Sequence, residues 1–331
     1  MGRVWMILVM CLTAGAVFGE PGGGEPVTPI QPSGHLDAAK VALGRKLFHD
    51  PRLSRGDAVA CSTCHQLQSG GADGRVRSLG SDGWPLEFNT PTVFNVSGNA
   101  RLNWKGNFRT LEEQNESVLR NTRIMNADWD ELLSKLRNDL DYLNDFSVIY
   151  GSSPARVHVL DTLATFERSL VTPNSRFDRR LRGESGAISP EEEQGYQLFK
   201  SYGCVACHQG ANFGGNLSQP FGIFDDPFNP RGAAGAGQDR LAATEAEGGA
   251  TAGAERGQLY RVPSLRNVAV TAPYFHNGYT SSLAEAVEIM GRSQLGRELS
   301  KDDVRLIVQF LNTLTGEYEG RPLAGSDSAA K

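Results

Sequence analysis

The sequence lacks both an excess of basic charge and a long apolar run. Its 33 lysines and arginines are outnumbered by 38 aspartates and glutamates, for a net charge of -5, so nucleic acid is not an expected partner. The apolar run from Val4 to Leu12 is too short to span a membrane. Because a plausible cleavage signal follows it, either "AGA" at 14–16 or "VFG" at 17–19, we predict a secretory signal peptide over residues 1–19 and a periplasmic mature chain.

Cysteine is also scarce, with five in the chain, and Cys11 lies inside the predicted signal peptide. In an exported protein the default interpretation of the remaining four would be two disulfides. However, both pairs are followed directly by histidine, in "CSTCH" and "CVACH", which is the spacing that attaches c-type haem and not the spacing of a zinc site. We therefore predict two covalently bound haem c groups, held by Cys61, Cys64 and His65 and by Cys204, Cys207 and His208.

The two motifs lie far enough apart for each haem to have its own domain. Helical patterns over 35–48, 128–140, 155–170, 189–203, 283–290 and 301–314, with no convincing hairpin pattern, predict an all-α fold of two cytochrome c-like domains. In the stripe over 155–170, Val157, Leu160, Leu163, Ala164 and Leu170 are expected in the core. The predicted parts are a flexible arm (20–34), an N-terminal haem domain (35–182), a C-terminal haem domain (183–318) and a tail (319–331). A polar connector (173–189) spans the domain boundary, residues 231–257 are expected to be a mobile loop, and one option for the last helix is packing back on the N-terminal domain.

Ligands for the far face of each iron are few. A thioether there raises the potential and blocks small molecules, whereas an open position admits peroxide. Outside the signal peptide the only methionines are Met125 and Met290. Spacing alone lets either methionine serve its own domain, so the residues themselves leave both open.

Several motifs in order, over roughly residues 35 to 318, resemble the bacterial di-haem cytochrome c peroxidases and the related MauG-like enzymes. They are "LGRKLFHDPRLS", "CSTCH", "NTPTVFN", "WKGNFRTLEEQ", "CVACH", "VPSLRNVAVTAPYFHNG" and "AVEIMGRSQLG". The resemblance implies that Met290 and His208 bind the iron of a high-potential electron-entry haem. It also implies that peroxide reacts at the His65 haem and that Trp104 carries electrons between the two.

Further site residues follow from the same resemblance. Asn89, Thr271 and Pro273 match a calcium site of oxygen donors. His276 matches a haem-pocket histidine, and Gln114 matches a glutamine that lines the peroxide pocket. A homodimer is also suggested.

The sequence departs from the family pattern in two places. Many members carry a histidine that caps the peroxidatic iron in resting enzyme, where this chain has "SLGSDGW" with Ser81 and Asp82, so we infer an open or water-bound first haem that needs no reductive activation. The family's proton-shuttling glutamate falls on Ile124, which cannot move a proton. The proposed substitutes are the carboxylates of Glu113, Glu116 and Asp128, or delivery through Gln114 and water.

The leading hypothesis is a periplasmic peroxidase that reduces hydrogen peroxide with electrons from a small cytochrome c or cupredoxin. The alternative is a MauG-like oxidase that modifies residues of a partner protein. The missing histidine favours this alternative and Met290 disfavours it. A plain electron carrier would need both irons closed and ranks last.

Overall fold

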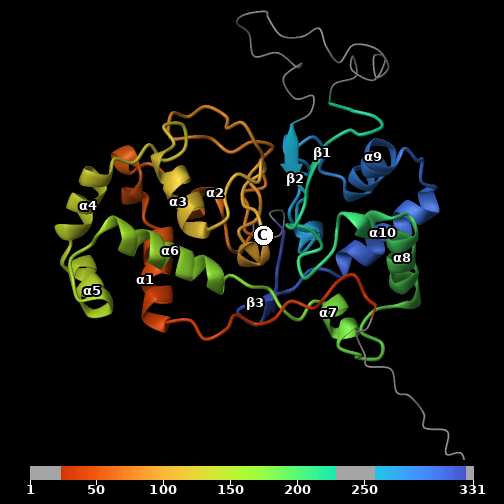
Figure 1. The fold of residues 1–331 in the computed structure, drawn as a ribbon, viewed down its shortest axis with the longest axis horizontal. Helices are drawn as coiled ribbons and strands as arrows, with labels where there is room; N and C mark the ends of the chain where they lie inside the picture. Colours follow the sequence, from red (N-terminus) through yellow and green to blue (C-terminus); the bar gives the residue numbers. More distant parts are fainter. Residues whose placement is uncertain (1–23, 229–257, 326–331) are drawn as a thin grey trace, which may run out of the picture.

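The computed structural model describes residues 24–228 and 258–325. The predicted signal peptide and the predicted mobile loop therefore lie outside the described residues. Within them the fold is mostly helical (Figure 1). The helices are α1 (Ala38–Phe48), α2 (Cys61–Cys64), α3 (Leu111–Arg120), α4 (Trp129–Arg137), α5 (Leu140–Tyr150), α6 (Arg156–Ser169), α7 (Arg176–Leu181), α8 (Pro190–Ser201), α9 (Leu283–Leu295) and α10 (Lys301–Asn312).

Side-chain caps set most of these boundaries, as the sequence indicated. Ser189, Ser282 and Ser300 accept hydrogen bonds from the backbone N–H groups at the third position of α8, α9 and α10. The helix expected over 128–140 is wrong in extent, because Asp139 caps a new helix, α5, right after α4 ends. The helix α3 was missed, although Thr110 and Glu113 form a capping box at its start.

The expectation of no strands also needs correction. Strands β1 (Ser218–Pro220) and β2 (Leu259–Arg261) pair antiparallel, and so do β3 (Glu317–Tyr318) and β4 (Arg321–Pro322). Each is two or three residues long, too short to show an alternating pattern in the sequence. The core stripe of α6 is right for Leu163, Ala164 and Leu170, but Val157 is 65% exposed.

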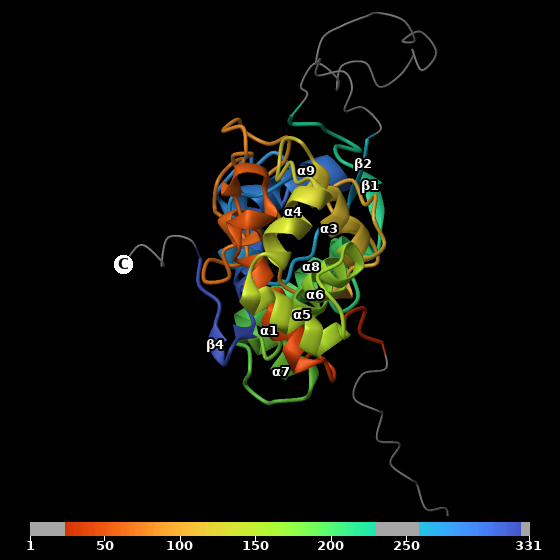
Figure 2. The ribbon, with the colours of Figure 1, turned by 90° about the vertical axis from the view of Figure 1, so that its left-hand side faces the viewer.

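The two halves of the chain repeat one arrangement. We call α1 through α6 the first unit and α8 through α10 the second unit; they lie side by side in Figure 1 and one behind the other in Figure 2. Residues 91 to 118 align without gaps with residues 263 to 290, an offset of 172 positions (267 − 95 = 276 − 104 = 172). Equivalent turns contain a bridge between Leu102 and Phe108 and a bridge between Tyr274 and Thr280. The N-caps Thr110 of α3 and Ser282 of α9 are also equivalent.

The helix pairs repeat too. Gly44 of α1 lies so close to α6 that a Cβ would stand 2.6 Å from the Cβ of Phe166, and Gly195 of α8 lies so close to α10 that a Cβ would stand 3.0 Å from the Cβ of Phe310. A glycine is needed at both crossings because any side chain would collide with the partner helix. The sequence carries the repeat as Gly-x-x-Leu-Phe at 44–48 and at 195–199.

Equivalent asparagines join the two units. The left-handed residues Asn95 and Asn267 start the short helices η3 (Val96–Gly98) and η6 (Val268–Val270). The side-chain Nδ2 of both donates to the hydroxyl of Thr172, at 2.7 and 3.0 Å. Their backbone N–H groups donate to the carbonyls of Leu170 and Leu314, which follow α6 and α10.

Each unit has its own apolar cluster, and residues near each end of the described chain pack in the cluster of the unit that is more distant from them in the sequence. The first-unit cluster includes Leu47, Phe48 and Phe166 and takes up Leu323 near the C-terminus. The second-unit cluster includes Phe199 and Phe310 and takes up Val27 near the N-terminus. The last helix, α10, packs on α8 within the second unit, and the residues that return to the first unit are Tyr318 of β3 and Leu323, which follows β4.

Two segments are more fixed than the sequence predicted. In the described part of the expected flexible arm, Val27 and Ile30 are buried. The expected polar connector contains α7, whose Phe177 and Asp178 are fully buried. Both expectations rested on polar and Gly/Pro-rich composition, which does not register contacts with distant residues.

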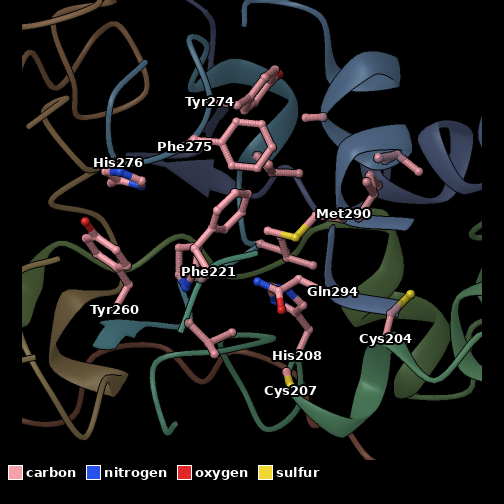
Figure 3. Close-up of a pocket in the computed structure, with 18 of the residues that line it drawn as sticks. Cys204, Cys207, His208, Phe221, Tyr260, Tyr274, Phe275, His276, Met290 and Gln294 are labelled. Carbon is pink, nitrogen blue, oxygen red and sulfur yellow. The ribbon is translucent and has the colours of Figure 1, made fainter. Parts of the chain in front are cut away.

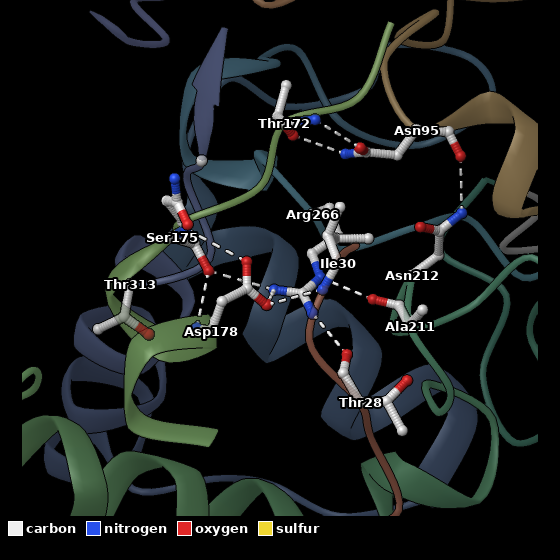
Figure 4. A network of polar contacts seen from close by, with 12 residues as sticks. Thr28, Ile30, Asn95, Thr172, Ser175, Asp178, Ala211, Asn212, Arg266 and Thr313 are labelled. Carbon is white, nitrogen blue, oxygen red and sulfur yellow. Dashed lines mark hydrogen bonds and ion pairs between the residues drawn. The ribbon is translucent and has the colours of Figure 1, made fainter. Parts of the chain in front are cut away.

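A buried ion pair ties these segments together (Figure 4). Asp178 Oδ1 lies 2.9 Å from Arg266 Nη1, and both side chains are at most 1% exposed. Asp178 also accepts from the backbone N–H of Ile30, while Arg266 donates to the carbonyls of Thr28 and Ala211. Ala211 lies in the loop after His208, so this network also holds the second histidine motif.

Asp178→Ala should lower the free energy of unfolding by about 3–5 kcal/mol, because Arg266 would keep a buried charge without its carboxylate. Glu184→Ala is the matched control: its ion pair with Arg179 is exposed and should contribute about 0–1 kcal/mol. Chemical denaturation of the haem-loaded proteins measures both values. Equal losses in the two variants would contradict this assignment.

Candidate functional site

The two motif histidines have the same surroundings. His65 Nδ1 lies 3.2 Å from the carbonyl of Gly71, and His208 Nδ1 lies 2.9 Å from the carbonyl of Phe213. Since a carbonyl can only accept, Nδ1 carries the proton and Nε2 is left as the metal-binding nitrogen. Burial lowers the pKa of both rings, which favours the neutral form that binds iron.

No disulfide joins the four motif cysteines or any other residues in the described part of the chain. Cys61 and Cys64 open and close the single turn of α2, and Cys204 opens the turn η4 (Cys204–Ala206). Burial raises the pKa of Cys61 to about 12 and that of Cys204 to about 11. Because neither pair forms a disulfide, both pairs are available for thioether attachment, as the haem interpretation requires.

A cavity of about 420 Å³ opens on the second motif. It is lined by Cys204, Cys207, His208 and Met290, and Figure 3 shows the Met290 sulfur and the His208 ring directed into it. Its volume is in the range of small-molecule and cofactor sites. The residues present thus fit a haem held by two thioethers, an imidazole and the Met290 sulfur.

Two buried polar atoms at this cavity support the fit. Arg261 Nη1 and His276 Nε2 have no hydrogen-bond partner among the described residues, and both side chains line the cavity. Burial lowers the pKa of Arg261 to about 10, and burial with the nearby Arg77 charge lowers that of His276 to about 4. Unpaired buried donors are costly, and the carboxylates of a haem would supply acceptors. The sequence analysis missed Arg261, which no local motif marks.

The repeat identifies the residue of the first unit that is equivalent to Met290 of the second. Met290 is the eighth residue after its N-cap Ser282, and Val118 is the eighth after Thr110 (290 − 282 = 118 − 110 = 8). Val118 is half-buried and packs on the first-unit cluster, together with Cys61. Valine has no lone pair to give to a metal. Met125, the other methionine considered, is 2% exposed within the same cluster.

The two departures from the family pattern lie together. The backbone N–H of Ser81 approaches the carbonyls of Arg123 and Ile124, each at 3.2 Å. Asp82 is exposed and accepts from the backbone N–H of Trp84. The loop of Ser81 and Asp82, which lacks the family's histidine, therefore contacts Ile124, which replaces the family's glutamate.

The proposed carboxylate substitutes are occupied elsewhere. Glu113 is exposed and closes the capping box of α3, which lowers its pKa. Glu116 bonds Trp129 Nε1 and Arg156, and Asp128 caps α4. Gln114 differs, because its Oε1 is buried without a partner among the described residues.

The remaining predicted residues meet where the two units touch. Trp104 and His276 occupy equivalent positions of the repeat, and their rings lie 6.3 Å apart edge to face. Trp104 Nε1 donates to the carbonyl of Asn89 at 2.7 Å. Asn89, Thr271 and Pro273 all line the same cavity as Trp104. The Asn89 Nδ2 donates to the carbonyl of Arg75, which leaves its Oδ1 as a potential ligand.

The fold and these two motif sites are those of a helical di-haem redox protein. A family model described as "Di-haem cytochrome c peroxidase" matches residues 38–186. Cytochrome c551 peroxidase of Nitrosomonas europaea is 38% identical over 95% of this chain and 92% of that protein. Cytochrome c peroxidase Ccp of Escherichia coli K12 is 41% identical over 89% of this chain, which spans 62% of the length of that relative.

A solved structure also matches. The crystal structure of a MauG-like protein associated with microbial copper homeostasis has a TM-score of 0.71, with 25% identity, over 88% of this chain and 93% of that one. The chain belongs to the bacterial di-haem cytochrome c peroxidase family, which includes the MauG-like proteins, and its enzyme class is that of the peroxidases. In the described part of the chain no helix is long and apolar enough to cross a membrane.

Proposed function

We propose that this protein reduces hydrogen peroxide to water at a haem held by Cys61, Cys64 and His65, without prior reductive activation. Electrons would come from a small redox protein, a cytochrome c or a cupredoxin, through a second haem held by Cys204, Cys207, His208 and Met290. Bound haem would supply the electron exchange and the cleavage of peroxide. The observation that carries the proposal is Val118, which stands where the second unit has its methionine.

The chain's own residues would then set the two sites apart. Met290 would close the second site to small molecules, while Val118 provides no ligand in the first. Gln114, one turn before Val118 on α3, presents a buried Oε1 that has no partner within residues 24–228 and 258–325 and can accept a hydrogen bond from peroxide. Its equivalent in the second unit is Ala286, which has no polar group.

Trp104 is proposed as the electron relay. Its ring lies between the units, in edge contact with His276, which lines the cavity at the second motif. The hydrogen bond from Nε1 to Asn89 fixes the indole. A fixed aromatic ring between two sites shortens each electron step.

A MauG-like oxidation of a partner protein is the second candidate, favoured by the open first site and by the likeness to the MauG-like structure. The Met290 thioether in the second cavity weighs against it, because the best-known enzyme of that kind resembles this family with tyrosine at that position. The proposed location is the periplasm, based on the predicted signal peptide and the resemblance to the peroxidases.

The proposed calcium site joins Asn89 of the first unit to the carbonyls of Thr271 and Pro273. Chelation with EGTA should lower the melting temperature, since a ligand present at about 100 times its Kd stabilises by about 2.7 kcal/mol. Asn89→Ala should melt lower and no longer respond to EGTA. Asn107→Ala, which changes an exposed asparagine, should keep the response. A wild-type melting temperature that EGTA leaves unchanged would rule out the site.

Turnover without pre-reduction tests the proposed function. Oxidised protein is mixed with peroxide and reduced cytochrome c, and donor oxidation is followed from the first seconds. We expect immediate steady turnover. A lag that pre-reduction removes would contradict the open site, and no turnover under either condition would favour the MauG-like alternative.

A further inference from the structure

Glu167, on α6, is a buried carboxyl that the proposed mechanism does not yet use. It is 7% exposed, and its Oε2 accepts a hydrogen bond from Asn115 Nδ2 at 2.9 Å. Burial raises its pKa to about 8; the Asn115 hydrogen bond and Arg168 oppose this, and Glu112 adds to it. The side chain is therefore a neutral acid at neutral pH.

The repeat places this carboxyl at the first haem. Phe166 of α6 and Leu170 just after it match Phe310 of α10 and Leu314 just after that helix (310 − 166 = 314 − 170 = 144), so Glu167 matches Leu311. Leu311 lines the cavity that holds His208 and Met290. An electrostatic interaction between Glu167 and Cys61 agrees with this placement, because Cys61 is the first attachment cysteine.

Asn115, the hydrogen-bond partner of Glu167, is also equivalent to a residue that lines the cavity at the second motif. Asn115 and Gln114 of α3 match Val287 and Ala286 of α9, and both of these line the second cavity. The three second-unit residues are apolar, whereas the three first-unit residues are Glu, Asn and Gln. At these three equivalent positions, polar side chains are thus present only on the side where peroxide is proposed to react.

The other charged groups near Glu167 have ion-pair or hydrogen-bond partners of their own. Glu112 of α3 and Arg168 of α6 form an ion pair of 2.5 Å. From α1, Arg45 lies over the Phe166 ring but bonds Tyr318 and Glu319. No cation bonded to the Glu167 carboxyl is found among the described residues, so the buried position itself keeps it protonated.

We propose that Glu167 stores a proton for peroxide cleavage at the first haem, in the role left vacant at Ile124. The inference rests on the proposed function. Each turnover takes hydrogen peroxide, two electrons from the donor protein and two protons to two waters. Glu167 releases one of these protons through pocket water to the departing oxygen as the O–O bond breaks. The carboxylate, held by Asn115, then takes a proton back from solvent.

The test compares wild type with Glu167→Gln, which keeps the shape and can still accept from Asn115. In wild type, an infrared carbonyl band of a protonated acid should be present at pH 7 and disappear as pH rises through about 8. Glu167→Gln should lack that band. Asp161→Asn, which changes an α6 carboxylate bonded to Lys40, should keep it. Absorbance of both haems checks that each variant is folded and loaded.

Turnover gives the second readout. Loss of one proton donor should lower kcat roughly 100-fold or more. The wild-type decline as pH rises through about 8 should be missing in Glu167→Gln, because only the protonated carboxyl donates. Absence of the band in wild type, or wild-type turnover and pH profile in Glu167→Gln, would overturn the inference alone. A wild type with no peroxide turnover would overturn the proposed function and this inference with it.

Discussion

Val118→Met should close the first haem site and lower peroxide turnover by roughly 100-fold, the factor for an iron that holds its sixth ligand 99% of the time. The helices α3 and α9 start at equivalent caps, so the new thioether would stand where Met290 stands in the second unit. The oxidised spectrum should change from one open and one closed haem to two closed haems. Turnover with reduced cytochrome c and the optical spectrum measure the two effects.

Val118→Leu is the matched control, because leucine is close to methionine in volume but has no sulfur. It should leave the first haem open, with turnover changed far less than in Val118→Met. If the two variants lose activity equally, bulk and not ligation is the cause. If Val118→Met remains fully active with one open haem, the equivalence of Val118 and Met290 is wrong.

Met290→His should lower the reduction potential of the second haem by a sizeable part of the roughly 0.8 V range that axial ligands control. Replacing the soft thioether by imidazole stabilises the oxidised iron, so electron entry from the donor should become unfavourable and turnover should fall. A potentiometric titration measures the change, with the first haem as internal reference.

The matched control is Met125→Leu. Met125 is buried in the first-unit cluster, and the exchange should cost less than about 1.5 kcal/mol of stability while both potentials stay the same. A second-haem potential that Met290→His leaves unchanged would show that Met290 is not the ligand. A shift caused by Met125→Leu would point to the other methionine.

Local signals predicted the starts of α8, α9 and α10, whereas long-range contacts were predicted poorly. The caps Ser189, Ser282 and Ser300 act within one turn, so the sequence shows them directly. The buried pair of Asp178 and Arg266 joins residues far apart in the chain, and its charges look like those of a surface segment. The helix α7 was therefore read as a polar connector.

The site shows the same division. The cysteine and histidine motifs are local and could be read from the sequence, whereas spacing left Met125 and Met290 undecided. Val118, Arg261 and Glu167 have no local signature, because a valine or a glutamate on a helix, or an arginine in a short strand, is ordinary. The offset repeat from Pro91 and Pro263 onwards was present in the sequence and would have identified Val118 as the equivalent of Met290. The contact of Glu167 with Asn115 needed the packing of α6 on α3.

The electron paramagnetic resonance spectrum of the oxidised protein as isolated tests the open first site most directly. The account predicts one high-spin haem, bound by His65 and open or water-bound on its other face, and one low-spin haem bound by His208 and Met290. Two low-spin haems in the resting protein would contradict it.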